Sequence, residues 1–574
     1  MTAATGTLNG AAIGPASSAT ATPAAGTLAL SRRELWLTVI GIGVIALAVR
    51  LVAATVVTFP IPEDTAYYYG VARNLVEGRG LVSDALWSFQ TPPLELPRAA
   101  FEVWLPLPSL IAAVPMTLLG SSFTTAQIMP VVASALIPIL AWALAWLVAV
   151  ERRLPRNRAR VVAIGAGLTA AVELPLVLHG TLPDSTALFA VLALVACILM
   201  ARLLSEPRGA RWRDARLIGL GVAIGLAALT RNEALWLAVT WAIVAWWFGR
   251  REIELRTRLR LVLIPGAVAA VVFLPWAIRD WATFGSPLPG QAIANAFSVT
   301  GFDIFAWQDP PTLARYLAQG PAGLINARIE GFSHNLFSVL LLPSFPVGWI
   351  GLAALPWFGR GRSLRPLLVF SLLTFAVTTL LFPVATTWGT YLHAAGATHV
   401  LLIVSCLFAL DAAIVRIGRW RGWTNPVAWL GPALTVSVAL MFTVIFLPGF
   451  GAQSTDVAAR YRALAGQLSA VGRPVDTLGP VISDFPIWFA EGERAPALGL
   501  PDESPRQILS LAQAFPGTRY LVMSSTDHGR WPAVLASGAP GAECFHEIDL
   551  ALARADAATR AALEDTHVWE LACP

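Results

Sequence analysis

The chain has 574 residues, of which 56% are hydrophobic and only 13% are charged, and its mean hydropathy is +0.65. Soluble proteins carry about 25% charged residues, so this composition excludes an ordinary soluble enzyme and predicts a polytopic membrane protein. The net charge of +5 comes from arginines, because the chain has no lysine, and these arginines are spread over short loops. That spread indicates membrane topology and excludes a nucleic-acid-binding patch.

The first 30 residues are mostly small and polar and carry almost no charge, which predicts a disordered tail in the cytoplasm. Leu35 to Thr58 follow as an apolar run of about 24 residues, shortly after Arg32 and Arg33. A signal peptide has an apolar core of only about 7–15 residues. The run therefore predicts the first transmembrane helix, with its amino end inside the cell.

Ten further apolar runs bring the predicted number of transmembrane helices to about eleven. These runs are 123–150, 161–178, 185–204, 217–230, 234–249, 261–279, 333–357, 366–384, 393–414 and 426–448. Five of the loops between them are rich in arginine: 152–160, 208–216, 250–260, 360–365 and 416–421. The positive-inside rule assigns all five loops to the cytoplasm.

Two segments are ambiguous, and the arginine loops decide both. Residues 104–120 are apolar, but they are short for a span and contain three prolines. A span here would also move every later arginine loop outside, so we predict that 104–120 lie at the outer interface. The same parity makes 217–249 a hairpin of two short helices that turns at 230–233, a polar turn that requires a protein-lined cavity.

The outer side then collects a long first loop at 59–122 and the tail after residue 450. The transmembrane part is predicted to cover 31–450, and 451–574 to form a small extracytoplasmic α/β domain. Its expected strands are 481–489, 519–525, 544–550 and 567–571, and its expected helices are 504–515 and 553–564. Cys544 and Cys573 both lie in this domain, where an oxidising compartment permits a disulfide, although sequence alone does not decide the pairing.

The most unusual polar stretch directly follows the first span: FPIPEDTAYYYGVARNLVEGRG, residues 59–80. Its adjacent carboxylates, Glu63 and Asp64, precede three tyrosines at 67–69. Paired carboxylates at a membrane surface are candidates for acid/base chemistry, and loops on rigid scaffolds often carry function. The structural alternative is that Asp64 caps a helix over Thr65 to Val76.

Two more carboxylates are expected close to the hydrocarbon on the outer side. Asp184 lies in HGTLPD between two spans, and Glu233 lies in the hairpin turn. A carboxylate at this depth is costly and usually has a partner or a function. For Asp184 the structural alternative is a cap on the helix that begins at Ser185, and both roles are compatible.

Cationic partners and one histidine are expected at the same level. Arg231 and Arg279 lie at the outer ends of their spans, and arginine binds phosphate with two parallel hydrogen bonds. Arg279 has a strong structural alternative, in which it simply reaches the lipid headgroups. His393, in GTYLHAAGA, is either a packing residue or a substrate contact.

Together these motifs resemble the GT-C superfamily of membrane glycosyltransferases, of the RgtA/B/C/D-like and protein-mannosyltransferase kind. The resemblance covers about residues 35–450 and depends on the order of the motifs. These motifs are ED followed by YYYGVARNLVEGRG, a proline-containing segment before the second span, PD at 183–184, GLAALTRNE at 225–233, LPWAIRDWATFGSPLP at 274–289 and GTYLHAAGA at 389–397.

The resemblance implies a GT-C-like enzyme with its active site on the outer face of a bacterial cell membrane. It implies transfer of a sugar, usually with inversion, from a polyprenyl-phosphate carrier to a hydroxyl of a lipid, glycan or protein acceptor. The implied general base is Asp64 or Glu63, with Asp184 as the next candidate. The implied substrate-binding side chains are Arg231, Arg279, His393, Glu233 and Tyr68.

No cofactor is firmly implied, and a divalent metal, Mg²⁺ or Mn²⁺, remains open because the sequence shows no dense set of oxygen ligands. The expected partners are the lipid-linked donor, the acceptor and membrane lipids. Two other classes remain: a transporter of lipid-linked saccharides, which would be expected to show repeated halves, and a non-catalytic scaffold. The scaffold would not need carboxylates and arginines gathered on one side of the membrane.

Overall fold

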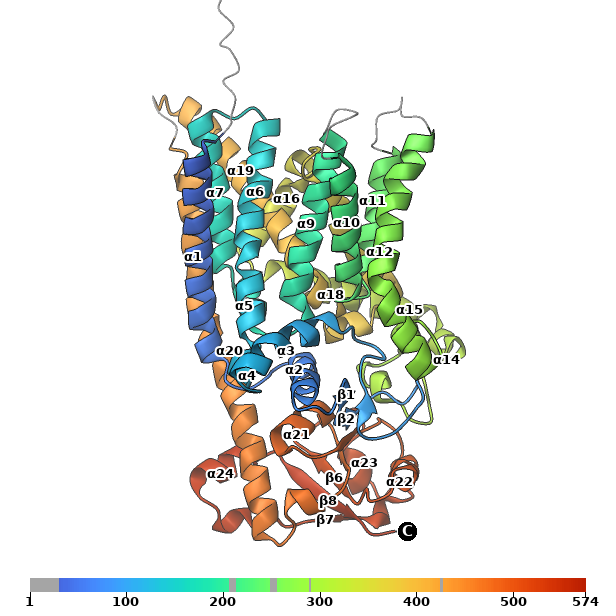
Figure 1. The fold of residues 1–574 in the computed structure, drawn as a ribbon. Helices are drawn as coiled ribbons and strands as arrows, with labels where there is room; N and C mark the ends of the chain where they lie inside the picture. The colour runs from blue at the N-terminus through green and yellow to red at the C-terminus, as the bar shows by residue number, and fades with distance from the viewer. Residues whose placement is uncertain (1–29, 206–212, 248–254, 289–290, 424–426, 574) are drawn as a thin grey trace, which may run out of the picture.

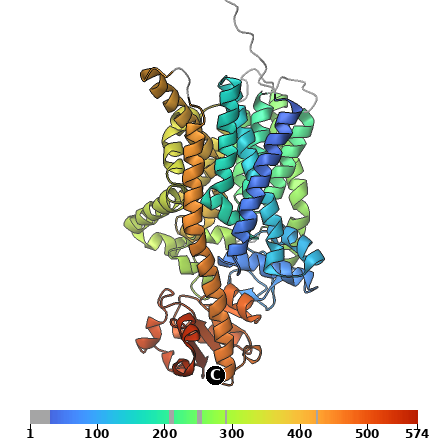
Figure 2. The same cartoon turned by 90° about the vertical axis from the view of Figure 1, so that its left-hand side faces the viewer.

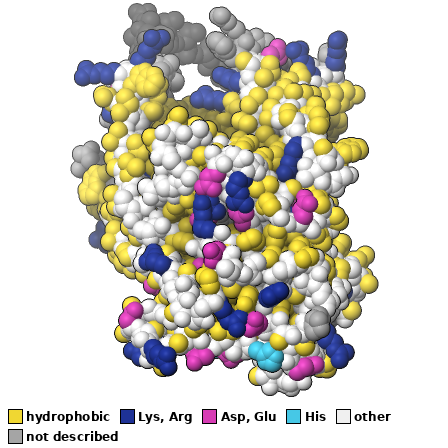
Figure 3. Space-filling view, turned by 60° about the horizontal axis from the view of Figure 1, so that its bottom comes forward, with side chains coloured by type: hydrophobic (Ala, Val, Ile, Leu, Met, Phe, Trp, Pro, Cys, Tyr) yellow, Lys and Arg dark blue, Asp and Glu magenta, His cyan; other side chains and the backbone are white. Residues whose placement is uncertain are grey.

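The structure, a computed structural model, describes residues 30–205, 213–247, 255–288, 291–423 and 427–573. The predicted disordered tail therefore lies almost entirely outside the described residues. A bundle of long helices fills one end of the molecule, and a mixed sheet with short helices forms the other (Figure 1). Figure 3 shows charged side chains scattered over the sheet end, whereas much of the bundle surface is apolar.

Among the described residues, six helical segments are long and apolar enough to cross a membrane. They are Arg32–Val56 (α1), Phe123–Glu151 (α4 to α6), Ser185–Ser205 (α9), Leu255–Phe284 (α12), Gly396–Trp420 (α19) and Leu430–Ala470 (α20). A seventh is broken: Arg156–Val172 (α7) continues as Leu174–Thr181 after a bend of 61°. The helical membrane fold is thus confirmed.

Four shorter helices lie within the bundle: Arg213–Ala228 (α10), Ala234–Trp247 (α11), Val347–Phe358 (α16) and Arg365–Leu381 (α17), of which the last three are apolar. The helices α10 and α11 form the predicted hairpin, and the chain turns between Ala228 and Ala234. The predicted count of eleven spans is not confirmed, because it depends on how these short helices cross the bilayer.

The predicted span at 333–357 is not one helix. Gly320–Ser333 (α15) continues as a π-helix over His334–Leu341, and the chain then turns before α16. Pro343 and Pro346 explain the break, since proline lacks the backbone N–H that continues a helix. Residues 104–120 behave as predicted: Leu107–Leu119 (α3) lies across the end of the bundle (Figure 1).

The arginine loop at 152–160 lies at the end of the bundle away from the sheet (Figure 1). Arg156 forms an ion pair with Glu34, at a distance of 2.6 Å, and Arg158 forms one with Asp411, at 2.5 Å. Arg152 Nη2 donates to the carbonyl oxygen of Trp357 at 2.8 Å. These contacts hold this loop against α1, α16 and α19.

The sheet has six strands in the order β2-β5-β4-β6-β8-β7. Its strands are Ala85–Leu86 (β2), Val481–Ser483 (β4), Ala497–Gly499 (β5), Tyr520–Met523 (β6), Phe545–Glu547 (β7) and His567–Leu571 (β8). The first four in this order are parallel, and β8 runs antiparallel to both of its neighbours, β6 and β7. Its helices include Pro486–Glu493 (α21), Pro505–Ala514 (α22) and Ala557–Ala562 (α24).

Three details of the tail differ from prediction. The strand expected at 481–489 ends at Ser483, because Pro486 begins α21 as its first residue, a position that proline favours. The three-residue strand β5 was not predicted. The strand β2 comes from the first outer loop, and it pairs with β5 through Ala85 opposite Ala497. The sheet is thus completed by a segment more than 400 residues away in sequence.

The long helix α20 connects the two ends of the molecule without interruption (Figure 2). The predicted domain boundary at 450 falls inside this helix. Tyr461 and Leu464, from the part of α20 beyond that boundary, belong to one buried apolar cluster with Tyr67 of the first loop and Phe489 of α21. A disulfide joins Cys544 to Cys573, as the sequence permitted.

Candidate active site

The stretch that follows the first span folds into a helix, Glu63–Val76 (α2). Pro62 occupies the N-cap position, and Glu63 and Asp64 lie in the first turn. Carboxylates there interact favourably with the helix dipole, as does Arg73 in the last turn. Asp64 is therefore not the N-cap, so the structural alternative considered for this residue is wrong.

Asp64 faces His393, which lies on the short helix Thr390–Ala394 (α18). The Asp64 Oδ2 atom is 3.1 Å from His393 Nε2. On the other side of the ring, His393 Nδ1 is 2.6 Å from the Thr186 hydroxyl. The His393 side chain is only 5% exposed, whereas that of Asp64 is 23% exposed. The carboxylate is thus oriented by a buried imidazole and still reachable from outside.

Asp184 approaches the same histidine from the turn before α9. Its Oδ1 accepts from the Thr186 backbone N–H at 2.8 Å, so the predicted capping role is confirmed. Its Oδ2 lies 3.8 Å from His179 Nδ1 and 3.4 Å from the Thr65 hydroxyl. Burial alone would raise the pKa of the Asp184 carboxyl, but neighbouring His179 holds it below its ordinary value.

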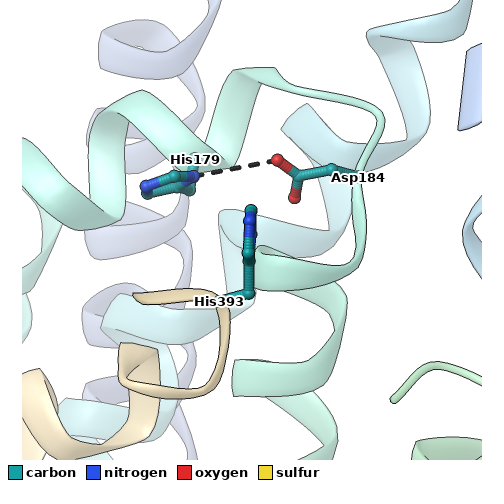
Figure 4. A group of neighbouring side chains, drawn as sticks. All are labelled: His179, Asp184 and His393. Atoms are coloured by element: carbon teal, nitrogen blue, oxygen red, sulfur yellow. Dashed lines mark ion pairs between the residues drawn. The ribbon is translucent and has the colours of Figure 1, made fainter. Parts of the chain in front are cut away.

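His179 and Asp184, from the turn before α9, converge with His393 of α18 (Figure 4). One ligand atom of each lies within 4.8 Å of the others, and all three residues are buried. His179 Nδ1 has no hydrogen-bond partner among the described residues, so it is available as a ligand. Two imidazoles and one carboxylate suit Mn²⁺ or Zn²⁺ better than Mg²⁺, which prefers oxygen ligands.

Arg231 lies in the turn between α10 and α11 and reaches this group from the side. Its Nε and Nη2 atoms donate to both carboxylate oxygens of Glu233, at 3.0 and 2.8 Å. Its Nη1 donates to the Ser185 hydroxyl at 2.8 Å. Tyr68 lies near both Arg231 and Asp64. The pKa of its phenol is raised, mainly by burial; Asp64 adds to this effect, and Arg231 opposes it. We call Asp64, His179, Asp184, Thr186, Arg231, Glu233 and His393 the His393 site.

Glu63 is adjacent to Asp64 in sequence but faces the C-terminal sheet. Its Oε1 accepts from the Ile487 backbone N–H of α21 at 3.2 Å. Burial, opposed by the hydrogen bond from Ile487 and aided by the nearby carboxylates of Asp484 and Asp64, raises the pKa of Glu63 to about 8. The two candidates for a general base therefore occupy different environments.

Arg279, which was predicted to hold substrate beside Arg231, lies in a different group. Its Nη1 donates to Asp280 Oδ1 at 3.0 Å, and its guanidinium stacks 4.7 Å from the Trp276 ring. Arg279 also lowers the pKa of buried Glu102, although burial raises it overall. Glu102 Oε1 lies 3.8 Å from Arg98 Nε. We call Arg98, Glu102, Arg279 and Asp280 the Glu102 cluster.

Thr186 of the His393 site was not predicted from the sequence as a functional residue. Neither were its neighbours Thr65 and Ser185, which contact Asp184 and Arg231. His179 belongs to the motif HGTLPD, in which only Asp184 was predicted to be functional. A signal did exist, because every residue from His179 to Thr186 except Leu182 is polar, glycine or proline, and the segment lies between two apolar helices. Such a concentration at membrane depth is typical of a functional turn.

No protein-family model and no curated protein matches the chain. Several solved structures do match the chain. ArnT from Cupriavidus metallidurans in the apo state shares 14% identity with a TM-score of 0.53, covering 95% of this chain and all of that one. The same protein bound to undecaprenyl phosphate matches with a TM-score of 0.53 at 14% identity over 93% of this chain and 99% of that one.

The Archaeoglobus fulgidus oligosaccharyltransferase, tethered with an acceptor peptide, is similar with a TM-score of 0.56 at 14% identity. That match covers 90% of this chain and 72% of the archaeal one. At this identity the likeness shows the fold, and it extends over the helical bundle and the C-terminal part alike. The chain therefore shares its overall fold with these solved structures.

Proposed function

We propose that the protein is a membrane glycosyltransferase that moves a sugar from a polyprenyl-phosphate carrier to an acceptor hydroxyl, with inversion. The observation that carries the proposal is the pairing of a partly exposed carboxylate, Asp64, with buried His393 beside Arg231. The fold supports it, since a similar structure binds undecaprenyl phosphate and another binds dolichol-phosphate and a peptide.

Asp64 acts as the general base in this proposal. Its carboxylate takes the proton of the acceptor hydroxyl while that oxygen forms a bond to the anomeric carbon of the sugar. The bond from that carbon to the carrier phosphate breaks, and the electron pair leaves with the phosphate. His393, held by Thr186, fixes the orientation of Asp64. Such proton transfer contributes about 10²–10⁴-fold to a rate.

Arg231 holds the leaving phosphate. Its pairing with Glu233 fixes the guanidinium plane, and Nη1, bonded once to Ser185, retains a second N–H for an oxygen of the donor. A guanidinium fixed in this way needs no reorganisation as negative charge develops on the phosphate. Glu233 is thus a positioning residue rather than a base.

A divalent metal would be held by His179, Asp184 and His393. When bound, it would supply positive charge next to the carrier phosphate. A complex of the similar archaeal enzyme with zinc and sulfate supports this possibility for the fold. Treatment with a chelator tests it: loss of transfer that Mn²⁺ or Zn²⁺ restores would establish the requirement, and unchanged transfer would exclude it.

The topology proposed for this function places the amino end in the cytoplasm and the C-terminal part outside a bacterial cell membrane, with about eleven crossings. The transmembrane part covers 31–450 and the extracytoplasmic part 451–574. Cysteines introduced near Ser454 and Asp184 should react with an impermeant reagent from outside, and a cysteine at Arg156 should not. Outside labelling at position 156 would contradict this orientation.

The activity test is transfer of labelled sugar from a polyprenyl-phosphate donor by the purified protein in detergent. Candidate sugars are hexoses and pentoses, and candidate acceptors are lipids, glycans and proteins. Mass spectrometry of lipids that co-purify with the protein should identify the donor to supply. Movement of a lipid-linked sugar across vesicles without transfer would indicate a transporter instead.

A further inference from the structure

The strand order of the C-terminal sheet reverses next to the first outer loop. From β4 the chain passes through α21 to β5 on one side, then through α22 to β6 on the other side of β4. The strand order therefore reverses at β4. In open sheets with parallel strands, ligands bind outside the carboxyl ends of the strands at such a reversal.

Polar side chains gather at that edge. Asp484 directly follows β4, and its Oδ2 accepts from the Ser524 backbone N–H and from the Ser525 hydroxyl, both at 2.9 Å. His528, whose Nε2 lies 3.0 Å from the Leu500 carbonyl oxygen, is close enough to influence the pKa of Asp484. Asp484, Ser524 and His528 are all buried.

The group that enters this edge is the side chain of Glu63. It accepts from the second residue of α21, Ile487, at 3.2 Å. The amino end of a helix favours an acceptor of this kind because its first N–H groups lack partners within the helix. Asp484 is near enough to raise the pKa of Glu63. The first turn of α2 therefore occupies the place of a ligand.

Two further ion pairs hold α2 against the same helix. Arg73, in the last turn of α2, pairs with Glu491 of α21, and both side chains are largely buried. Glu77, just beyond α2, lies 3.2 Å from Arg494, just beyond α21. The strand β2 adds backbone pairing to β5 a few residues later. The helix that carries Asp64 is thus attached to the C-terminal part at both of its ends.

We infer that Glu63 is a positioning residue: by docking the first turn of α2 against the amino end of α21, beside the carboxyl end of β4, it sets the position of Asp64 against His393. This inference depends on the proposed role of Asp64. Adjacent helix residues point about 100° apart, so one of the pair faces the sheet while the other faces the acceptor. A shift of about 1 Å in a catalytic group costs on the order of 10²-fold in rate.

The test compares Glu63→Gln with Glu63→Ala in the full-length protein, with exposed Glu95→Ala of the same loop as the control. Glutamine keeps an oxygen that accepts from Ile487, and a neutral side chain matches a group whose pKa is about 8. We expect Glu63→Gln to keep turnover within about 3-fold of wild type, and Glu63→Ala to lower it at least about 10-fold with unchanged donor affinity.

Two results would overturn the inference. If Glu63→Gln lost as much turnover as Asp64→Asn, Glu63 would be the base, and if Glu63→Ala behaved as Glu95→Ala does, its docking would not matter. Full activity of Asp64→Asn would instead overturn the proposed role of Asp64, which separates the two failures. If Glu63→Ala does not fold, Glu63→Asp, one methylene shorter, is expected to show the same loss.

Discussion

Two groups of charged residues lie at the end of the bundle that faces the C-terminal sheet, and their charge balance differs. The Glu102 cluster contains two arginines and two carboxylates, and aromatic rings cover Arg279. The His393 site contains three carboxylates and one arginine, so with both histidines neutral its formal charge is −3 + 1 = −2. The formal charges of the Glu102 cluster cancel, whereas those of the His393 site do not.

This difference indicates which group is built for a ligand. A buried site with excess negative charge is costly unless a proton or a cation compensates it. A metal at the His393 site, or protonation of its histidines, would supply that compensation and would also let an anionic phosphate approach. The Glu102 cluster needs no such partner. The predictions below would each break or sharpen this contrast.

The largest expected effect is that of Asp64→Asn. The amide keeps the size of the side chain and can still contact His393, but it cannot accept the acceptor's proton. We expect turnover to fall by at least about 10², with donor affinity largely kept. The measurement is single-turnover sugar transfer with donor affinity determined separately. Near wild-type turnover would remove Asp64 from the mechanism and make Asp184 the leading candidate.

His393→Ala should have the next largest effect. It removes the group that orients Asp64 and one of three potential metal ligands. Loss of an orienting partner typically costs about 10–100-fold in activity or metal affinity. Turnover should therefore fall by about that factor, while exposed His546→Ala should behave as wild type. Equal activities of the two variants would show that His393 only packs.

Arg231→Ala should weaken donor binding as well as turnover, because the guanidinium meets the phosphate before the reaction begins. A charge-assisted hydrogen bond contributes about 1.5–3 kcal/mol, which corresponds to at least about a 10-fold increase in donor Kd. Arg360→Ala, an exposed arginine in a loop on the opposite face, serves as the control. A normal Kd in Arg231→Ala would contradict the assignment of this arginine to the phosphate.

The docking of α2 should depend on pH through Glu63. Its pKa is about 8 in the structure against an ordinary value of 4.5, so the folded state binds the extra proton between these values. Stability is then full below about pH 4.5 and declines as pH rises toward 8. Asp64, Asp484, Tyr461 and nearby His528 share this interface.

The apparent Tm of wild type should therefore fall by a few degrees from pH 6 to pH 8. A shift of this size corresponds to about 1 kcal/mol in a domain of roughly 150–250 residues. Glu63→Gln, which carries no titrating proton, should show a smaller decline over the same range. Parallel pH profiles for the two proteins would show that Glu63 does not govern the docking.

The smallest effect is expected for Arg279→Ala. In the structure this arginine interacts with Asp280 and two aromatic rings, at the balanced cluster. Donor Kd should change by less than about 2-fold, although removing one partner of a partly buried pair should lower stability. A loss of donor affinity equal to that of Arg231→Ala would erase the distinction between the two groups.

Much of this arrangement was predictable from the sequence. Arginine loops and apolar runs predicted the helical bundle, the hairpin at 217–249 and the segment at 104–120 that does not span. Of the predicted residues, Asp64, Asp184, Arg231, Glu233 and His393 do come together, because each lies at the outer end of a helix. Hydropathy marks where each apolar run ends, so it predicted that these residues lie at a similar depth.

What the sequence could not show is lateral placement and rotation. Arg231 and Arg279 lie at the same depth, but only the packing of α10 and α12 separates their side chains into two groups. Glu63 and Asp64 are neighbours, and the start of α2 at Glu63 decides which way each points. The strand β2 has two residues and pairs with β5 far along the chain, so no local pattern marks it.

The most direct test of the central claim is transfer by the wild-type protein itself, followed by determination of the anomeric configuration in the product. A polyprenyl-phosphate sugar of known configuration is supplied with an acceptor, and the product is examined by NMR. With Asp64 as a base that activates the acceptor, we expect transfer with inversion, and no transfer above background in Asp64→Asn. Retention of configuration, or equal transfer by Asp64→Asn, would contradict it.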